Sequence, residues 1–274
     1  MENILYISDL DGTLLDINAS VSGQTAEMLN EFIIHGGNFS YATARTAATA
    51  LVITKEIKIN VPVVLMNGVC IFDTITNEYV KIESIEHNAL YQMLIILKKF
   101  RLSGFLFSIQ DSILQTYYEN TDSENARRFV EERQKKFGKV FTKVSDFLNC
   151  LDKNIIYYSV TDRYDVLEKV YSSLLSVEGI HIDFYRDVYD ENYWYLEVCS
   201  YKASKYNAIR YIREKYRFDK VIGFGDNLND IPMFKACDEA YAVENAKDEV
   251  KKHADGIIPS NTANGVARKI CGLL

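Results

Sequence analysis

The chain has 274 residues, of which 48% are hydrophobic and 25% are charged, and its formal net charge at pH 7 is −7. This composition excludes a disordered or collagen-like chain, and the acidic balance provides no basic stripe of the kind that binds a nucleic-acid backbone. Since single domains commonly have about 100–200 residues, we expect two packed units.

The N-terminal segment opens with a short apolar run followed by acidic residues. It has no basic region, no cleavage signature and no apolar span long enough to cross a bilayer. We therefore expect a cytoplasmic protein with neither a nucleic-acid partner nor a membrane partner. The sequence leaves the oligomeric state open.

Short apolar runs recur in the first and last parts of the chain, and the first of them covers residues 4–7. The others are residues 39–42, 63–66, 221–224, 240–243 and 256–258. Most are separated by stretches with helical periodicity, such as residues 25–35 and 205–216. Alternating strands and helices predict an α/β fold with a parallel sheet whose strands are buried on both faces.

The middle of the chain has a different pattern, with aromatic and β-branched strands and fewer, charged helices. The predicted strands are residues 105–109, 114–118, 155–161, 180–186 and 193–199, and the predicted helices are residues 85–100, 124–137 and 163–177. This pattern favours an α+β unit in which helices cover one face of a mainly antiparallel sheet. We predict that this unit, residues 82–199, is inserted into a parallel-sheet core made of residues 1–81 and 200–274.

Two carboxylates stand at the end of the first predicted strand, in the segment Asp-Leu-Asp-Gly-Thr at residues 9–13. Open α/β sheets bind ligands in the crevice beyond the carboxyl ends of their strands. A phosphoryl group needs a nucleophile and a proton for its leaving group, so Asp9 could attack while Asp11 carries the proton. The alternative is a pair of turn acids that cap a helix.

A second acidic segment, Gly-Asp-Asn-Leu-Asn-Asp at residues 225–230, follows another predicted buried strand. Mg²⁺ needs only one or two carboxylates together with water and substrate oxygens, so Asp9 and Asp226 would suffice, with a backbone carbonyl near Asp11. The alternatives are a calcium loop or a polar turn, but the segment lacks the closing glutamate of an EF-hand.

Thr43, at a strand end, and Lys205, at a helix start, are two further candidates. A hydroxyl donor and a fixed ammonium group would orient a phosphoryl group. Taken singly, a structural threonine and a solvated lysine are the more common interpretations.

In this order the segments resemble the haloacid dehalogenase (HAD) superfamily of phosphatases. The arrangement is similar to its Cof-type members of class IIB, which carry a large α/β cap between the second and third motifs. The matching segments are residues 9–13, Thr43 with Arg45, Asn67 with Gly68, residues 196–198 followed by Lys205, and residues 225–230. Residues 244–246, 254–256 and 264–267 resemble the closing loops of the family.

The resemblance implies a Rossmann-like parallel-sheet HAD core with an inserted α+β cap domain, and it implies a role for each matching residue. Asp9 would be phosphorylated and Asp11 would be the general acid and base. The Mg²⁺ ligands would be Asp9, the Asp11 carbonyl and Asp226, and the phosphate would be held by Thr43, Lys205 and Asn229. The supporting residues would be Thr13, Arg45, Asn67, Gly68 and Asp230.

The chain departs from the family pattern at a few positions. The family often has Thr-Gly-Arg where this chain has Ala44 in the middle, and it often has proline and glycines where this chain has Ser200, Lys202 and Tyr206. These departures leave the predicted chemistry unchanged and bear on cap hinge motion and pocket shape.

The leading hypothesis is Mg²⁺-dependent hydrolysis of a small phosphorylated metabolite, such as a sugar phosphate, through an aspartyl phosphate. One alternative is a phosphomutase of the same superfamily, which would protect the phosphoryl-enzyme from water. The other is a catalytically silent metabolite-binding protein, which would not need all four acids of the two motifs.

Aromatic residues of the predicted second unit have two interpretations, as a platform that stacks on a sugar or as internal packing, and packing is the more common one. These residues are Tyr117, Tyr118, Tyr157, Tyr158, Tyr185 and Trp194.

Overall fold

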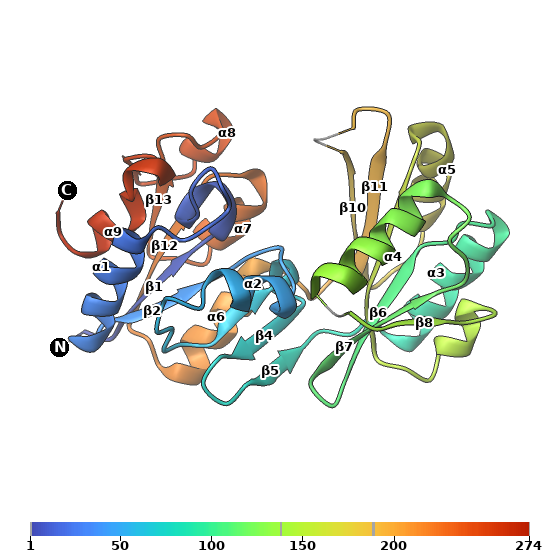
Figure 1. The fold of residues 1–274 in the computed structure, drawn as a ribbon, viewed down its shortest axis with the longest axis horizontal. Helices are drawn as coiled ribbons and strands as arrows, with labels where there is room; N and C mark the ends of the chain where they lie inside the picture. Colours follow the sequence, from blue (N-terminus) through green and yellow to red (C-terminus); the bar gives the residue numbers. More distant parts are fainter. Residues whose placement is uncertain (1, 138, 188–189, 274) are drawn as a thin grey trace. The chain divides into compact units, whose positions relative to one another are not determined.

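The computed structural model describes residues 2–137, 139–187 and 190–273. The chain divides into two compact units, the first made of Met1–Lys81 and Ala203–Leu274 and the second of Ile82–Lys202 (Figure 1). Within the described residues, no helix combines the length and the apolar character needed to cross a bilayer.

The first unit is built on a five-stranded parallel sheet with the order β14-β13-β12-β1-β2. Its strands are β1 (Ile4–Ser8), β2 (Asn38–Tyr41), β12 (Lys220–Gly225), β13 (Glu239–Val243) and β14 (Gly256–Ile258). The interior strand β1 pairs with β12 on one side and with β2 on the other. Leu5 and Ile7 point to one face of β1 and are fully buried, whereas Ile4 and Tyr6 point to the other face and are partly buried. The apolar run thus predicts the strand but not full burial of both its faces.

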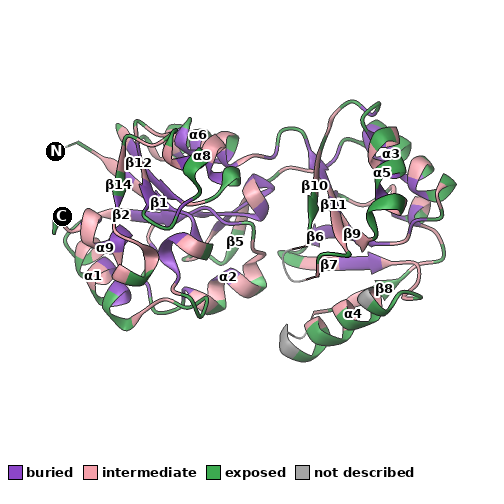
Figure 2. Ribbon diagram, turned by 90° about the horizontal axis from the view of Figure 1, so that it is seen from above, coloured by how far each residue is buried: buried purple, intermediate pink, exposed green. Residues whose placement is uncertain are grey.

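Helices lie on both faces of this sheet (Figure 2). They are α1 (Gly23–Ile34), α2 (Ala47–Ile53), α6 (Lys205–Tyr216), α7 (Ile231–Phe234), α8 (Asp248–Lys251) and α9 (Gly265–Ile270). Helix α6 buries Ile209 and Ile212 against a core that includes Leu5 and Val221. Helices α1 and α9 contact each other on the other face.

A small three-stranded sheet completes the first unit and corrects the prediction for residues 63–66. Strand β3 (Val63–Leu65) pairs antiparallel with β4 (Cys70–Asp73), which is followed in the sheet by β5 (Glu78–Ile82). It is joined to the end of β2 by a parallel bridge between Ala42 and Val64 and by the hydrogen bond from Thr43 N–H to the Val64 carbonyl. The chain reverses directly after β3, so β4 pairs antiparallel with it.

The second unit contains a six-stranded sheet with the order β10-β11-β9-β6-β7-β8. Its strands are β6 (Phe105–Gln110), β7 (Ile113–Tyr118), β8 (Phe141–Lys143), β9 (Ile155–Asp162), β10 (Ile180–Arg186) and β11 (Trp194–Ser200). Its neighbouring strands pair antiparallel, apart from the parallel pair β7 and β8. The sheet is therefore mainly antiparallel, as predicted.

The helices of this unit cover both faces of its sheet, so the prediction of one covered face is wrong. Helices α3 (His87–Lys99) and α5 (Tyr164–Leu174) pack on the face that carries Leu106. Helix α4 (Glu124–Phe137) lies on the other face, where Phe129 stacks on Phe105 with ring centroids 4.4 Å apart (Figure 2). Adjacent residues of a strand point to opposite faces, so Phe105 packs against α4 while Leu106 faces α3 and α5.

The aromatic residues of the second unit mostly pack inside it. Tyr117 and Tyr158 belong to its core, and Trp194 packs against that core. Tyr185 donates a hydrogen bond to Glu197 over 2.9 Å.

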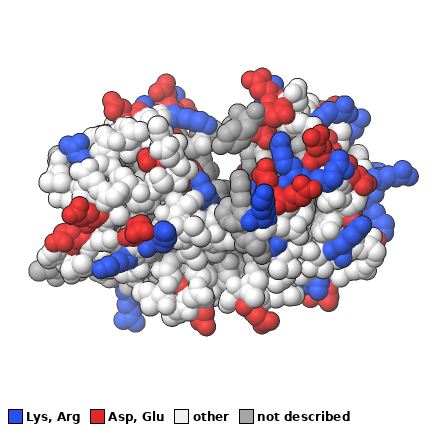
Figure 3. Space-filling model, in the orientation of Figure 1, with Lys and Arg blue, Asp and Glu red and all other residues white. Residues whose placement is uncertain are grey.

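On the face of the molecule drawn in Figure 3, acidic and basic side chains are interspersed.

Candidate active site

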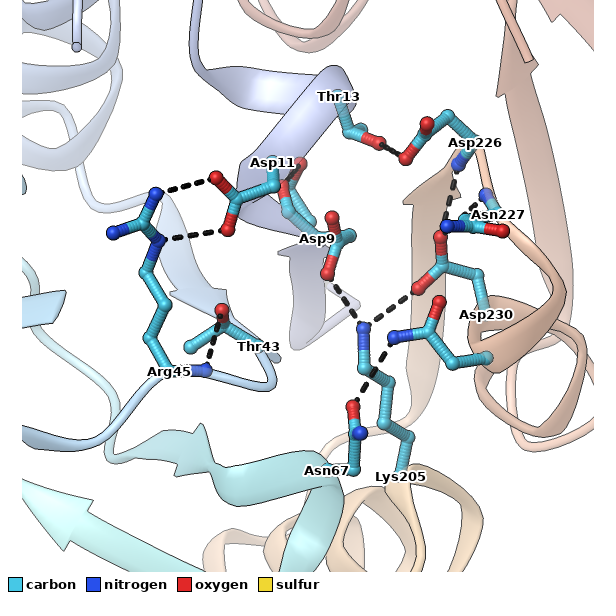
Figure 4. Close-up of polar contacts among 12 residues, drawn as sticks. Asp9, Asp11, Thr13, Thr43, Arg45, Asn67, Lys205, Asp226, Asn227 and Asp230 are labelled. Carbon is cyan, nitrogen blue, oxygen red and sulfur yellow. Dashed lines mark hydrogen bonds and ion pairs between the residues drawn. The ribbon is translucent and has the colours of Figure 1, made fainter. Parts of the chain in front are cut away.

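The candidate site lies at the carboxyl edge of the parallel sheet. Asp9 directly follows β1, Asp226 directly follows β12, and Thr43 comes shortly after β2. Because these three strands are parallel neighbours, their carboxyl ends meet at one edge. Lys205 reaches the same place from the first residue of α6 (Figure 4).

The first motif forms a wide turn, Leu10–Leu14, in which Gly12 has the positive φ of 77°. A Cβ atom on Gly12 would lie only 2.5 Å from an oxygen of the Asp226 carboxylate. Position 12 therefore requires glycine for two reasons: the positive φ and the close approach of the two motifs.

Lys205 is the buried centre of a charge cluster. Its Nζ lies 2.6 Å from Asp9 Oδ1 and 2.6 Å from Asp230 Oδ1. The three residues are at most 5% exposed. Burial alone would lower the pKa of Lys205, but the charges of Asp230 and Asp9 raise it above its ordinary value, so the ammonium stays charged.

One lysine cannot neutralise two carboxylates, so the cluster favours a further positive charge, either a proton or a cation. Burial raises the pKa of Asp9 well above its usual range, and repulsion from Asp230 raises it further, against the attraction of Lys205. Burial also raises the pKa of Asp226 to about 6, although Thr13 donates a hydrogen bond of 2.9 Å to that carboxylate. A bound cation would remove this electrostatic cost.

The donor set fits a divalent cation. One oxygen from each of Asp9, Asp226 and Asp230 lies within 4.8 Å of the others. Both oxygens of Asp230 already accept hydrogen bonds: one from Lys205, and the other from the N–H groups of Asp226 and Asn227 over 2.9 and 3.0 Å. In the described part of the chain, the second oxygens of Asp9 and Asp226 accept no hydrogen bond and are available as hard oxygen ligands.

Asp11 points to a different partner. Its carboxylate is half exposed and accepts two hydrogen bonds from the Arg45 guanidinium, with N–O distances of 2.7 and 2.6 Å. Thr43 is buried, and its hydroxyl accepts the Arg45 N–H over 3.2 Å. The Thr43–Arg45 turn therefore holds the carboxylate of Asp11 with both oxygens engaged.

A strained turn supports the other side of the site. Met66, Asn67 and Gly68 all have positive φ values, a conformation that costs about 1–3 kcal/mol for residues other than glycine. A Cβ on Gly68 would lie 2.2 Å from the carbonyl oxygen of Ser204, the residue before Lys205. Asn229 donates a hydrogen bond of 3.2 Å to Asn67. The turn thus packs against the start of α6.

The structure brings the predicted residues together in three linked groups. Asp9, Lys205 and Asp230 form the buried cluster, to which Thr13 and Asp226 are adjacent. Thr43, Arg45 and Asp11 form the second group, and Asn67, Gly68 and Asn229 form the third. Their catalytic and binding roles stay predictions.

Two asparagines near the site have no predicted role. Asn245 donates a hydrogen bond of 2.7 Å to the Gly12 carbonyl, and Asn261 donates one of 2.7 Å to the Leu15 carbonyl. The resemblance places Asn245 in a closing loop, but an asparagine after a strand is also an ordinary turn residue. The sequence therefore gives no signal that either amide reaches the first motif.

Comparison with known proteins identifies the family of the chain. The family model of haloacid dehalogenase-like hydrolases matches residues 6–270. A 5-amino-6-(5-phospho-D-ribitylamino)uracil phosphatase of Bacillus subtilis is 24% identical over 97% of this chain and 94% of its own. A pyridoxal phosphate phosphatase of Escherichia coli is 21% identical over 96% of this chain and 95% of its own.

Solved structures agree in fold. A sugar phosphatase of HAD subclass IIB superposes with a TM-score of 0.72 at 21% identity, covering 99% of this chain and 100% of that one. The predictions of the family, the α/β fold and a hydrolase of the phosphatase class are confirmed. The chain belongs to the family of haloacid dehalogenase-like hydrolases.

Proposed function

We propose that this protein is a Mg²⁺-dependent phosphatase that hydrolyses small phosphate monoesters through an aspartyl phosphate on Asp9. The observation that carries the proposal is the buried cluster in which Lys205 lies 2.6 Å from Asp9, beside the Asp226 carboxylate. Three carboxylates around one lysine favour a bound cation, and the Asp9 oxygen that accepts no hydrogen bond is available for attack.

In the first half-reaction, an Asp9 oxygen forms a bond to phosphorus while the bond from phosphorus to the ester oxygen breaks. Lys205 fixes the other Asp9 oxygen. Once Asp11 has left Arg45 and taken up a proton from solvent, it gives that proton to the departing oxygen. Thr43, Lys205 and Asn229 are the proposed phosphate-holding residues. Mg²⁺, when bound, offsets the repulsion between the carboxylates and the phosphate.

In the second half-reaction, Asp11 takes a proton from water, and the water oxygen attacks phosphorus. The bond between Asp9 and phosphorus then breaks, so phosphate leaves and the Asp9 carboxylate is restored. The same residue thus serves as acid and then as base. Since its carboxylate is paired with Arg45 in the structure, reorientation of Asp11 precedes each turnover.

We further propose that residues 1–81 and 200–274 are the catalytic core and that residues 82–199 are the inserted cap. Every candidate site residue lies in the first compact unit, which supports this division. The substrate is proposed to be a sugar phosphate or a similar small metabolite. Support comes from the relatives, whose names describe phosphatases of pyridoxal phosphate, a ribitylaminouracil phosphate and sugars.

Phosphate release from a panel of phosphorylated metabolites tests the proposal. We expect turnover with Mg²⁺, loss of turnover in EDTA and recovery when excess Mg²⁺ is restored, because two carboxylates and a phosphate dianion repel one another without a cation. Free phosphate, rather than an isomerised phosphate ester, distinguishes a phosphatase from a phosphomutase. Equal turnover in EDTA and in Mg²⁺ contradicts the metal requirement.

Lys205→Ala is expected to raise KM and to lower kcat, because the ammonium steadies both the bound phosphate and the nucleophile. It also leaves the buried Asp9 and Asp230 without their shared cation, so the melting temperature should fall. Lys215→Ala, an exposed lysine on the same helix, is the control and should change neither property. Wild-type kinetics in Lys205→Ala would remove the residue from the site.

A further inference from the structure

One short turn after β13, residues 244–247, is hydrogen-bonded to both acidic motifs. The Asn245 side chain donates to the Gly12 carbonyl over 2.7 Å, in the first motif. The Lys247 N–H donates to the Asp226 carbonyl over 3.0 Å, directly after β12. The turn therefore bridges the backbones that carry the proposed metal ligands.

The Asn245 amide is itself held in one orientation. Its Oδ1 accepts the N–H of Asn261 over 3.1 Å, so its NH₂ group faces the Gly12 carbonyl, where a donor is needed. Asn261 in turn donates from its own side chain to the Leu15 carbonyl over 2.7 Å. One pair of asparagines thus fixes the Gly12 carbonyl, inside the wide turn, and the Leu15 carbonyl, directly after it.

Asn245 and Asn261 act where the first acidic motif packs closely against the second. Gly12 packs directly against Asp226, since a Cβ there would lie 2.5 Å from its carboxylate. The Asp11 carbonyl belongs to the peptide that ends at the Gly12 nitrogen. Holding the Gly12 carbonyl restrains Gly12, and with it the adjoining Asp11–Gly12 peptide, in its place beside Asp226.

We propose that Asn245, oriented by Asn261, is a positioning residue that sets the spacing between the Asp11–Gly12 peptide and Asp226 and thereby the affinity of the site for its divalent cation. This inference rests on the proposed function. The Asn245 side chain bonds to backbone groups rather than to the carboxylates, so it acts through the first motif.

Mn²⁺ binding to the substrate-free protein, measured by electron paramagnetic resonance of the unbound ion, tests the inference. For Asn245→Ala we expect Mn²⁺ affinity to fall about 10- to 100-fold, the usual effect of losing an outer partner of a metal site. At saturating Mg²⁺, kcat should return close to the wild-type value. A purely structural role would lower the melting temperature without changing the affinity of the folded protein.

Asn60→Ala is the matched control, because Asn60 also links two backbone segments, accepting from Phe39 N–H over 3.1 Å and donating to the Gly37 carbonyl over 2.9 Å. It lies by the start of β2, at the opposite edge of the sheet, and should bind Mn²⁺ within twofold of wild type. Folded Asn245→Ala protein with wild-type affinity overturns the inference.

Asn245→Ser decides the matter if Asn245→Ala does not fold. It keeps a polar side chain in the turn but is too short to replace the bond to the Gly12 carbonyl, so a loss of affinity in the same direction is expected. Unchanged affinity in this variant overturns the inference. If wild-type protein neither binds Mn²⁺ nor releases phosphate, the proposed function itself fails, and the inference fails with it.

Discussion

Asp9→Asn is expected to lower kcat on the order of 10⁶-fold, the scale of loss found when a covalent nucleophile is removed. The amide keeps the shape of the side chain but cannot form the acyl phosphate. Lys205 and Asp230 remain paired, so the fold should be retained. Phosphate release gives the rate, and circular dichroism checks the fold.

The same substitution should raise the melting temperature of the metal-free protein at pH 7. Burial raises the pKa of Asp9 above the value of an unfolded chain, so its ionisation favours the unfolded state progressively as pH rises beyond about 4. Asn removes that cost. Asp165→Asn, an exposed acid in the second unit, is the control and should change neither the rate nor the melting temperature. Near wild-type turnover in Asp9→Asn means that another residue attacks.

Asp11→Asn should separate the two half-reactions. A nitrophenolate departs without a proton, whereas a sugar alkoxide does not, so the variant should phosphorylate Asp9 with p-nitrophenyl phosphate and fail with alkyl phosphates. Hydrolysis of the aspartyl phosphate still lacks its base. We expect a stoichiometric burst of nitrophenol, then slow turnover, and a phosphoryl adduct on Asp9 in mass spectra of the quenched protein.

Arg45→Gln is the informative companion to this variant. It removes the guanidinium that holds Asp11 but keeps the acid and base, so it should show steady turnover without a burst. Absence of both burst and adduct in Asp11→Asn, or wild-type rates with alkyl phosphates, shows that Asp11 is not the acid and base.

The sequence predicts most of the parallel sheet because its strands are continuous apolar runs. It predicts that Asp9 and Asp226 converge because both follow such runs, and the carboxyl ends of neighbouring parallel strands meet. Lys205 is different. Nothing in its neighbourhood distinguishes a buried helix lysine from a solvated one, so only the resemblance to the family singles it out.

The remaining features depend on contacts that a local pattern does not contain. Helix α4 has the expected periodicity, but the face of the sheet that it covers depends on contacts of Phe129 with Phe105 and Phe141. The bond from Asn245 to Gly12 joins residues at opposite ends of the chain. Such pairings follow from the completed sheet, so they become visible only in three dimensions.

The position of β1 between β2 and β12 has a consequence for biosynthesis. Ile4 is paired with Lys220, so β1 cannot complete its pairing until the ribosome has made β12 much later. The second unit is one continuous stretch, Ile82–Lys202, and all its strands have emerged before β12 exists. Domains commonly fold as units during synthesis, whereas pairings between distant segments form slowly. We therefore expect the inserted unit to fold first on the ribosome and the carboxylate cluster to assemble last.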